Sequence, residues 1–163
     1  EKGNLNRFEL PKPIINKGGC NLSFAGLKTA VLKISKQIKT KQDKFDLAAS
    51  FQKTIEKILN EKTKIAFKEY KKINPGRKNT FVIAGGVAAN KKIRAGLTNL
   101  SYKENFQPIF PPMNLCSDNA AMVAMVGLEK FKLKRFDKFN YPAKPRWPLD
   151  PKAPFLKGAG VKL

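Results

Sequence analysis

Two short segments of the chain carry residues that could bind a nucleotide. In the first, VIAGGVAAN (residues 82–90), Gly85 and Gly86 end an apolar run and Asn90 follows. Glycines let a ligand approach the backbone closely, and the start of a following helix presents free N–H groups to phosphate. The spacing fits neither GxGxxG nor the P-loop, which disfavours dinucleotide and Walker-type sites. We expect Asn90 one turn inside that helix, where its amide can contact a ribose or base; the alternative is a plain turn with Asn90 exposed.

The second segment is LCSDNAAM (residues 115–122), in which Asp118 precedes an apolar helical pattern. Gly85–Gly86 and Asp118 both follow the carboxyl end of an expected strand, so we expect them at the same edge of a sheet, where ligands of α/β proteins collect. A carboxylate there can bind a metal or position a phosphate-bound cation. The alternative is that Asp118 only favours the helix dipole.

Other reactive residues give weaker signals. In SFAGLKT (residues 23–29), Ser23, Lys28 and Thr29 could face a ligand, with a plain helix start as the alternative. Cys20 and Cys116 are far apart and form no CxxC pair, which is typical of reduced cysteines. The chain contains no His, which excludes a Ser–His or Cys–His pair and any His-ligated metal site made by this chain alone.

The elements that must position these residues follow an α/β order. Apolar periodicity predicts a helix from Leu27 to about Ile38 and a longer one over residues 44–73, about 45 Å long, capped by Asp43 or Asp46 and ended by Pro75–Gly76. Next come a buried strand at 80–84, a helix at 88–100, a strand at 107–110 and a helix at 118–132 with Ser117 as N-cap. The last residues are rich in Pro and Gly, and we expect an extended tail.

Charge is extreme, since 33 basic and 12 acidic residues give a net charge of +21. Such an excess favours a polyanion partner because lysines near phosphates release counterions. Only five of the cations are Arg, however, and the lysines are spread along the whole chain, which a lysine-rich genome explains equally well. Charge alone therefore leaves RNA binding and compositional bias as equal alternatives.

Five segments in one order resemble a known family: NLSFAGLKTAV, DLAASFQ, VIAGGVAANKKIR, FPPMNLCSDNAAMVAMVGLEKF and KPRWPLD. The chain is similar, over about residues 8–150, to the C-terminal half of the bacterial tRNA N6-adenosine threonylcarbamoyltransferases, once labelled O-sialoglycoprotein endopeptidases. Ala25 and Ser117 stand where Ser and Thr are common in that family. The first Met is Met113, so we expect the chain to be part of a longer protein.

The resemblance implies the α/β fold of the actin, Hsp70 and sugar-kinase superfamily, with a partial C-terminal lobe over residues 1–150 and a tail over 151–163. It implies transfer of a threonylcarbamoyl group from threonylcarbamoyl-AMP to the N6 amine of the adenosine beside the anticodon in tRNA. Gly85, Gly86 and Asn90 match the substrate-binding loop, and Asp118 matches a metal ligand. The metal would be iron, with zinc or magnesium as alternatives.

The family's two further metal ligands are His of an HxxxH motif, and this chain has no His, so we expect it to be inactive alone. No residue of the chain is expected to act as a catalytic nucleophile. The implied partners are tRNA, threonylcarbamoyl-AMP and the proteins of the bacterial transfer complex, in the cytoplasm, with neither membrane nor DNA. A small-molecule kinase of the same superfamily and a non-enzymatic basic RNA-binding module remain the alternatives.

Overall fold

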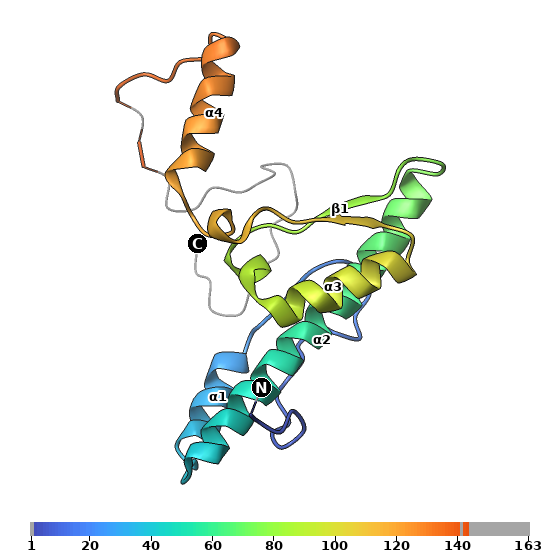
Figure 1. The fold of residues 1–163 in the computed structure, drawn as a ribbon, viewed down its shortest axis with the longest axis vertical. Coiled ribbons are helices and arrows are strands. Elements are labelled where there is room, and N and C mark those ends of the chain that lie inside the picture. The colour runs from blue at the N-terminus through green and yellow to red at the C-terminus, as the bar shows by residue number, and fades with distance from the viewer. Residues whose placement is uncertain (1, 141, 144–163) are drawn as a thin grey trace. The chain divides into compact units, whose positions relative to one another are not determined.

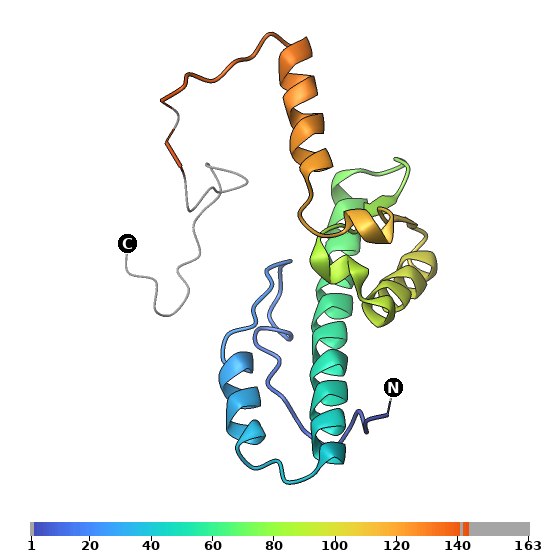
Figure 2. The ribbon, with the colours of Figure 1, turned by 60° about the vertical axis from the view of Figure 1, so that its left-hand side comes forward.

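The computed structural model describes residues 2–140 and 142–143, and the chain divides into two compact units between Asn119 and Ala120. Among the described residues, the first unit holds three α-helices, two strands and two short 3-10 helices, and the second holds one helix (Figures 1 and 2). This is an α/β chain with a small parallel sheet, as the sequence predicts.

The chain starts irregularly and enters α1 (Leu27–Ser35) through Gly26, whose φ of 75° lies in the left-handed region that favours glycine. Leu27 is the one fully buried residue of α1. The helix ends at Ser35, so Ile38, which we predicted to be its last residue, lies outside it.

The longest element is α2 (Lys41–Ile73), 33 residues, which confirms the predicted long helix and its end before Pro75–Gly76. The predicted cap is wrong. Thr40 is the N-cap and forms a capping box, in which its side chain accepts from the Asp43 N–H while the Asp43 carboxylate accepts from the Thr40 N–H. The helix therefore begins three residues earlier than expected.

Residues 2–10, here called the N-terminal strap, lie along the first half of α2. The Asp46 carboxylate accepts from the Asn4 N–H at 2.7 Å and from Arg7 at 2.9 Å. Ser50 accepts from the Phe8 N–H at 3.2 Å. The backbone N–H of Asn4, helped by the Gln42 amide and by Arg7, holds the pKa of Asp46 below its ordinary value of 3.8. Buried polar groups of α2 thus fix the strap to the helix.

The sheet pairs β1 (Thr80–Val82) in parallel with β2 (Gln107–Ile109), with Val82 opposite Ile109. On its covered side, Phe81 meets the ring of Phe67 edge-on at 4.9 Å. Phe67 also stacks on Phe106 at 3.8 Å, which ties α2 to the start of β2. These aromatic contacts form the core beneath the sheet.

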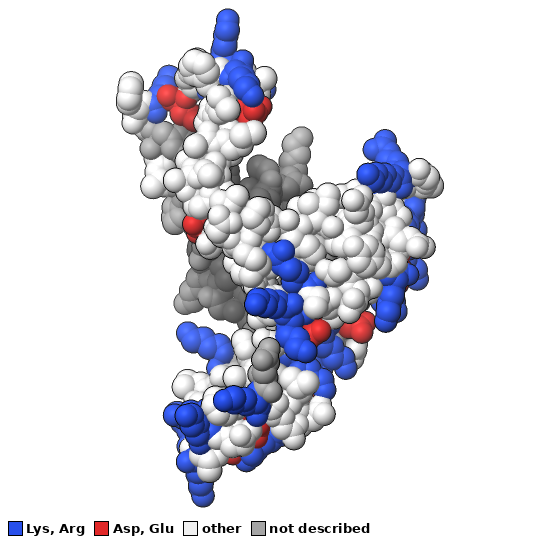
Figure 3. Space-filling model, in the orientation of Figure 1, with Lys and Arg blue, Asp and Glu red and all other residues white. Residues whose placement is uncertain are grey.

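The prediction that the first strand is buried is wrong for one face of this sheet, the face that carries Val82 and Ile109. Val82 is 62% exposed and its partner Ile109 is 44% exposed. Alternate residues of a strand point to opposite faces, and only the face of Phe81 is packed within this unit. Figure 3 shows a broad area without charged side chains over β1.

The second unit contains α4 (Ala120–Lys132), which has no buried residue although its composition is mostly apolar. The helix begins at Ala120 rather than at Asp118, so Ser117 is too far from its first turn to be the N-cap. Within the described part of the chain, no helix is both long enough and apolar enough to cross a membrane. The predicted tail, including KPRWPLD and Arg146, lies outside the described residues.

Candidate functional site

The glycine loop follows β1 directly and leads into a short 3-10 helix, η1 (Gly86–Ala89). Gly85 has φ 87° and ψ 171°, a conformation that is essentially limited to glycine. A Cβ added at Gly85 or Gly86 would meet no atom within 4 Å, so the backbone here is bare and open. This is the exposed backbone that the sequence predicts, although the element it opens is η1 rather than a long helix.

Asn90 is the N-cap of α3 (Lys91–Lys103), and the expectation that it lies one turn inside the helix is wrong. Its side-chain oxygen accepts from the N–H groups of Lys92 at 3.0 Å and Ile93 at 3.2 Å. The four residues of η1 take up the chain length that we assigned to the first helical turn. The carboxamide oxygen is therefore committed to the helix, and only the amide nitrogen is left to meet other groups.

The Asn90 amide nitrogen donates to Gln52 of α2 at 3.2 Å. Gln52 is the last residue of the DLAASFQ segment, whose Asp46 and Ser50 bind the N-terminal strap. One N–H of Asn90 is used by Gln52, and the second has no partner among the described residues. Both the oxygen and the nitrogen of the Asn90 carboxamide are therefore hydrogen-bonded, and one N–H of the nitrogen is still available to a ligand.

Arg94 joins the two segments that the sequence singles out. Its guanidinium donates to the Ala88 carbonyl at 3.0 Å on one side. On the other side it donates to the Pro111 carbonyl and to Cys116 Sγ, each at 3.3 Å, and it lies 4.4 Å from the Phe110 ring centroid. The glycine loop and the segment that carries Asp118 are therefore fixed to each other by one side chain of α3.

Asp118 follows the buried Cys116 by two residues and is exposed. Its carboxylate has no hydrogen-bond or ion-pair partner in the part of the chain that the structure describes. The parallel pairing of β1 and β2 places the carboxyl ends of the two strands side by side, and Gly85 follows the first by three residues and Asp118 the second by nine. No three His, Cys, Asp or Glu residues gather as a metal-binding group within residues 2–140 and 142–143.

A hollow of about 310 Å³ lies beside the glycine loop, lined mainly by carbon atoms from Leu22, Ile83, Ala84 and Val87. Buried Lys62 also lines it and donates to the Lys17 carbonyl at 2.6 Å. Ala84 and Val87, which flank Gly85–Gly86 in the sequence, are the part of the loop that lines it.

The third candidate segment gives no comparable cluster. The Ser23 hydroxyl accepts from the Ala25 N–H at 3.3 Å, a local turn contact, and Lys28 and Thr29 are exposed on α1. Cys20 is a free, exposed thiol and Cys116 a free, buried one. The plain helix start describes this segment better than a ligand site.

Sequence reasoning missed Gln52 and Arg94, the two residues that hold the loop in place. Each acts over a long sequence separation, 38 residues for Gln52 and 17 to 22 for Arg94 toward the second segment. The only signal was that both lie inside segments shared with the family, DLAASFQ and VIAGGVAANKKIR.

An α/β domain with a bare glycine loop directly after the carboxyl end of a parallel strand is typical of nucleotide-binding proteins. The family model described as tRNA N6-adenosine threonylcarbamoyltransferase matches residues 1–125, which include Gly85, Gly86, Asn90 and Asp118. The chain belongs to this family.

Curated relatives named tRNA N6-adenosine threonylcarbamoyltransferase agree. The protein of Pelagibacter ubique strain HTCC1062 is 73% identical over 163 residues, which are 100% of this chain and 46% of that protein. The protein of Ruegeria sp. strain TM1040 is 44% identical over 99% of this chain and 46% of its own length. That of Rhodospirillum rubrum is 41% identical, over 98% and 45%. The chain spans about half the length of the curated relatives that it matches.

Proposed function

We propose that this chain contributes the adenylate-binding part of an enzyme that transfers a threonylcarbamoyl group from threonylcarbamoyl-AMP to the N6 amine of the adenosine beside the anticodon of tRNA. The observation that carries the proposal is the family match over residues 1–125, since it includes both segments that Arg94 joins. We further propose the fold of the actin, Hsp70 and sugar-kinase superfamily, with residues 1–150 as part of its C-terminal lobe, residues 151–163 as a tail, and a cytoplasmic site of action.

The chemistry asks little of a protein nucleophile. Threonylcarbamoyl-AMP is a mixed anhydride, so its carbonyl is already activated and AMP is the leaving group. The N6 amine forms the new C–N bond, the C–O bond to the AMP phosphate breaks, and the amine loses one proton. The task of this chain is to bind and orient the donor.

In this proposal, the bare backbone of Gly85–Gly86 lies against the AMP part of the donor, and the free N–H of Asn90 donates to it. The apolar hollow formed by Leu22 and Val87 is the place for the adenine ring. The proteins of the bacterial transfer complex are the further partners that we propose for the whole enzyme.

The metal that the family implies, with iron first and zinc or magnesium as alternatives, does not fit this chain alone. Asp118 offers one exposed carboxylate, and the described residues hold no group of three ligands. A single oxygen ligand holds a transition metal weakly, whereas two His and one carboxylate hold it well. We propose that Asp118 joins two His supplied by the part of the relatives' length that this chain does not span.

The test joins this chain to the part of the Pelagibacter ubique relative that it does not match. The joined protein should bind iron and should form the modified nucleoside from threonylcarbamoyl-AMP and unmodified tRNA, measured by mass spectrometry with the partner proteins present. The chain alone should do neither, and Asp118→Ala in the joined protein should abolish both. Turnover by the isolated chain, or full activity of the Asp118→Ala protein, would refute the metal role.

A further inference from the structure

One side of α2 carries five lysines in line, here called the lysine ridge and composed of Lys53, Lys57, Lys64, Lys68 and Lys71. At 100° per residue, the five positions fall within about 60° of the helix circumference and extend over about 27 Å. The lysines of α1 do not line up in this way, because Lys28 and Lys33 lie about 140° apart on their helix. The general excess of lysine does not by itself place five of them on one narrow face.

Within its own sector of α2 the ridge carries no opposing charge, although Glu9, Glu61 and Glu104 line the hollows beside it. Between residues 53 and 73, no acidic residue of α2 falls within the same 60°, and Glu61 lies just beside it. Lys71 pairs with Glu104 at 3.2 Å. Lys57, Lys64 and Lys68 are exposed and have no ion-pair or hydrogen-bond partner among the described residues.

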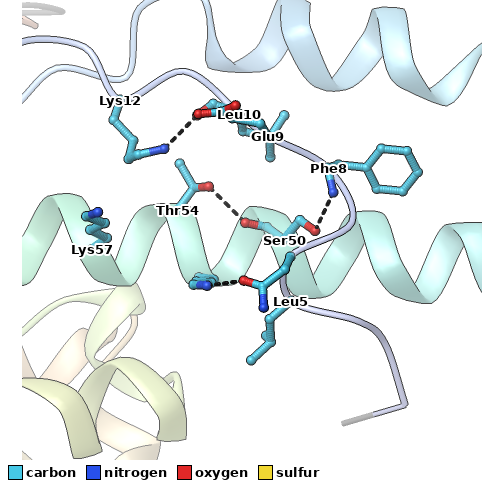
Figure 4. A pocket seen from close by; sticks show the side chains of 10 residues that line it. Leu5, Phe8, Glu9, Leu10, Lys12, Ser50, Thr54 and Lys57 are labelled. Atoms are coloured by element: carbon cyan, nitrogen blue, oxygen red, sulfur yellow. Dashed lines mark hydrogen bonds between the residues drawn. The ribbon is translucent and has the colours of Figure 1, made fainter.

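Hollows follow the ridge on its surface. A groove of about 590 Å³ is lined by four lysines, Lys64, Lys68, Lys71 and Lys72, and by Glu61 and Glu104. Another, of about 260 Å³, lies where the N-terminal strap crosses α2 (Figure 4). Its charged lining consists of Lys12, Lys53 and Lys57 and one carboxylate, Glu9. Lysines outnumber carboxylates in both hollows, three to one in the smaller and four to two in the larger.

We propose that the lysine ridge binds the phosphodiester backbone of the tRNA substrate. This inference rests on the proposed function and names the surface that docks the RNA. A row of ammonium groups suits a row of phosphates, and Lys without Arg favours backbone contact over base recognition. Within the 60° sector, residues 53–71 of α2 are all Lys, so the ridge lacks the aromatic anchors that are typical of protein–protein interfaces.

The test measures binding of the 163-residue chain to an unmodified tRNA transcript between 50 and 200 mM salt, by fluorescence anisotropy. The ridge variant replaces Lys57, Lys64 and Lys68 by Gln. Each lost phosphate contact removes about 0.7 to 0.9 from the slope of log affinity against log salt. The slope should therefore decrease by about 2 to 3, which corresponds to roughly 20- to 40-fold less change in affinity over this salt range.

The matched control replaces Lys33, Lys36 and Lys44 by Gln, which removes the same charge from exposed positions that lie off the ridge. The control should keep a slope close to that of the original chain. Equal losses in both variants would overturn the ridge and attribute binding to overall charge. Polyglutamate that displaces the tRNA at equal charge concentration would overturn the RNA assignment in favour of an acidic protein.

Failure of the ridge and failure of the proposed function give different results. If the joined enzyme forms the modified nucleoside while the ridge and control variants bind tRNA equally, the ridge is wrong and the function stands. If the ridge variant alone loses tRNA affinity while the joined enzyme forms no modified nucleoside, the surface is correct and the reaction is wrong.

Discussion

Asn90 combines a structural and a proposed ligand-binding role, and substitutions can separate the two. Its side-chain oxygen caps α3 through Lys92 and Ile93, and its nitrogen meets Gln52. Asn90→Asp keeps both acceptor contacts and places a negative charge at the helix N-terminus, which is favourable. Asn90→Ala removes the cap and the contact to Gln52 together.

The expected magnitudes follow from those contacts. Loss of an N-cap costs about 1 kcal/mol, and loss of one further hydrogen bond costs about 1 kcal/mol. Asn90→Ala should therefore lower the free energy of unfolding by about 2 kcal/mol, whereas Asn90→Asp keeps the cap, loses only the hydrogen bond to Gln52 and should lower it by about 1 kcal/mol or less. Urea unfolding followed by circular dichroism measures both values.

The affinity for AMP should be reduced in Asn90→Asp even though this variant keeps the helix cap. Asn90→Asp retains the helix but has no N–H to donate, and its charge repels phosphate, so calorimetry in the joined protein should show at least a tenfold loss of AMP affinity, about 1.4 kcal/mol. Asn90→Asp with unchanged AMP affinity would refute direct contact. Asn90→Ala with unchanged stability would refute the capping role.

Two further predictions concern the strap and the link between the site segments. The pKa of Asp46 is lowered in the folded chain, so its contribution to stability is complete above the ordinary value of 3.8 and is lost as pH falls through the lower folded value. Urea unfolding from pH 6 to pH 2.5 should show this loss of stability. Asp46→Asn should reduce the dependence of stability on pH. Arg94→Ala removes the contacts to Pro111 and Cys116, so the slower-reacting of the two thiols should be labelled several times faster by a thiol reagent, and unchanged labelling would contradict the link.

The long helix and the order of strands could be predicted because local patterns determine them. The apolar spacing of α2 holds over 33 residues, and Pro75–Gly76 stops it irrespective of the tertiary environment. The two short apolar runs that became β1 and β2 were likewise recognised from their residue types.

Other features depend on partners that no local pattern reveals. GVAA is compatible with either an α-helical or a 3-10 turn, so the position of Asn90 relative to α3 was misplaced by one turn. The exposure of Val82 depends on how many layers cover the sheet, which a five-residue run does not report. The contacts of Arg94 join carbonyl groups and a thiol from distant segments, and such contacts follow from the fold rather than from spacing.

The bare face of the sheet has a consequence for how the chain behaves as a colloid. Val82 and Ile109 present apolar surface on a pair of strands that no third strand joins within residues 2–140 and 142–143, a pattern that favours self-association. A net charge of +21 opposes this, since like-charged molecules repel one another at low ionic strength. The repulsion reaches about 10 Å at 0.1 M salt and about 3 Å at 1 M. Raising the salt screens this repulsion and allows the apolar strand faces of two molecules to come into contact. Self-association of the chain should therefore increase under the same conditions that weaken its binding to a polyanion.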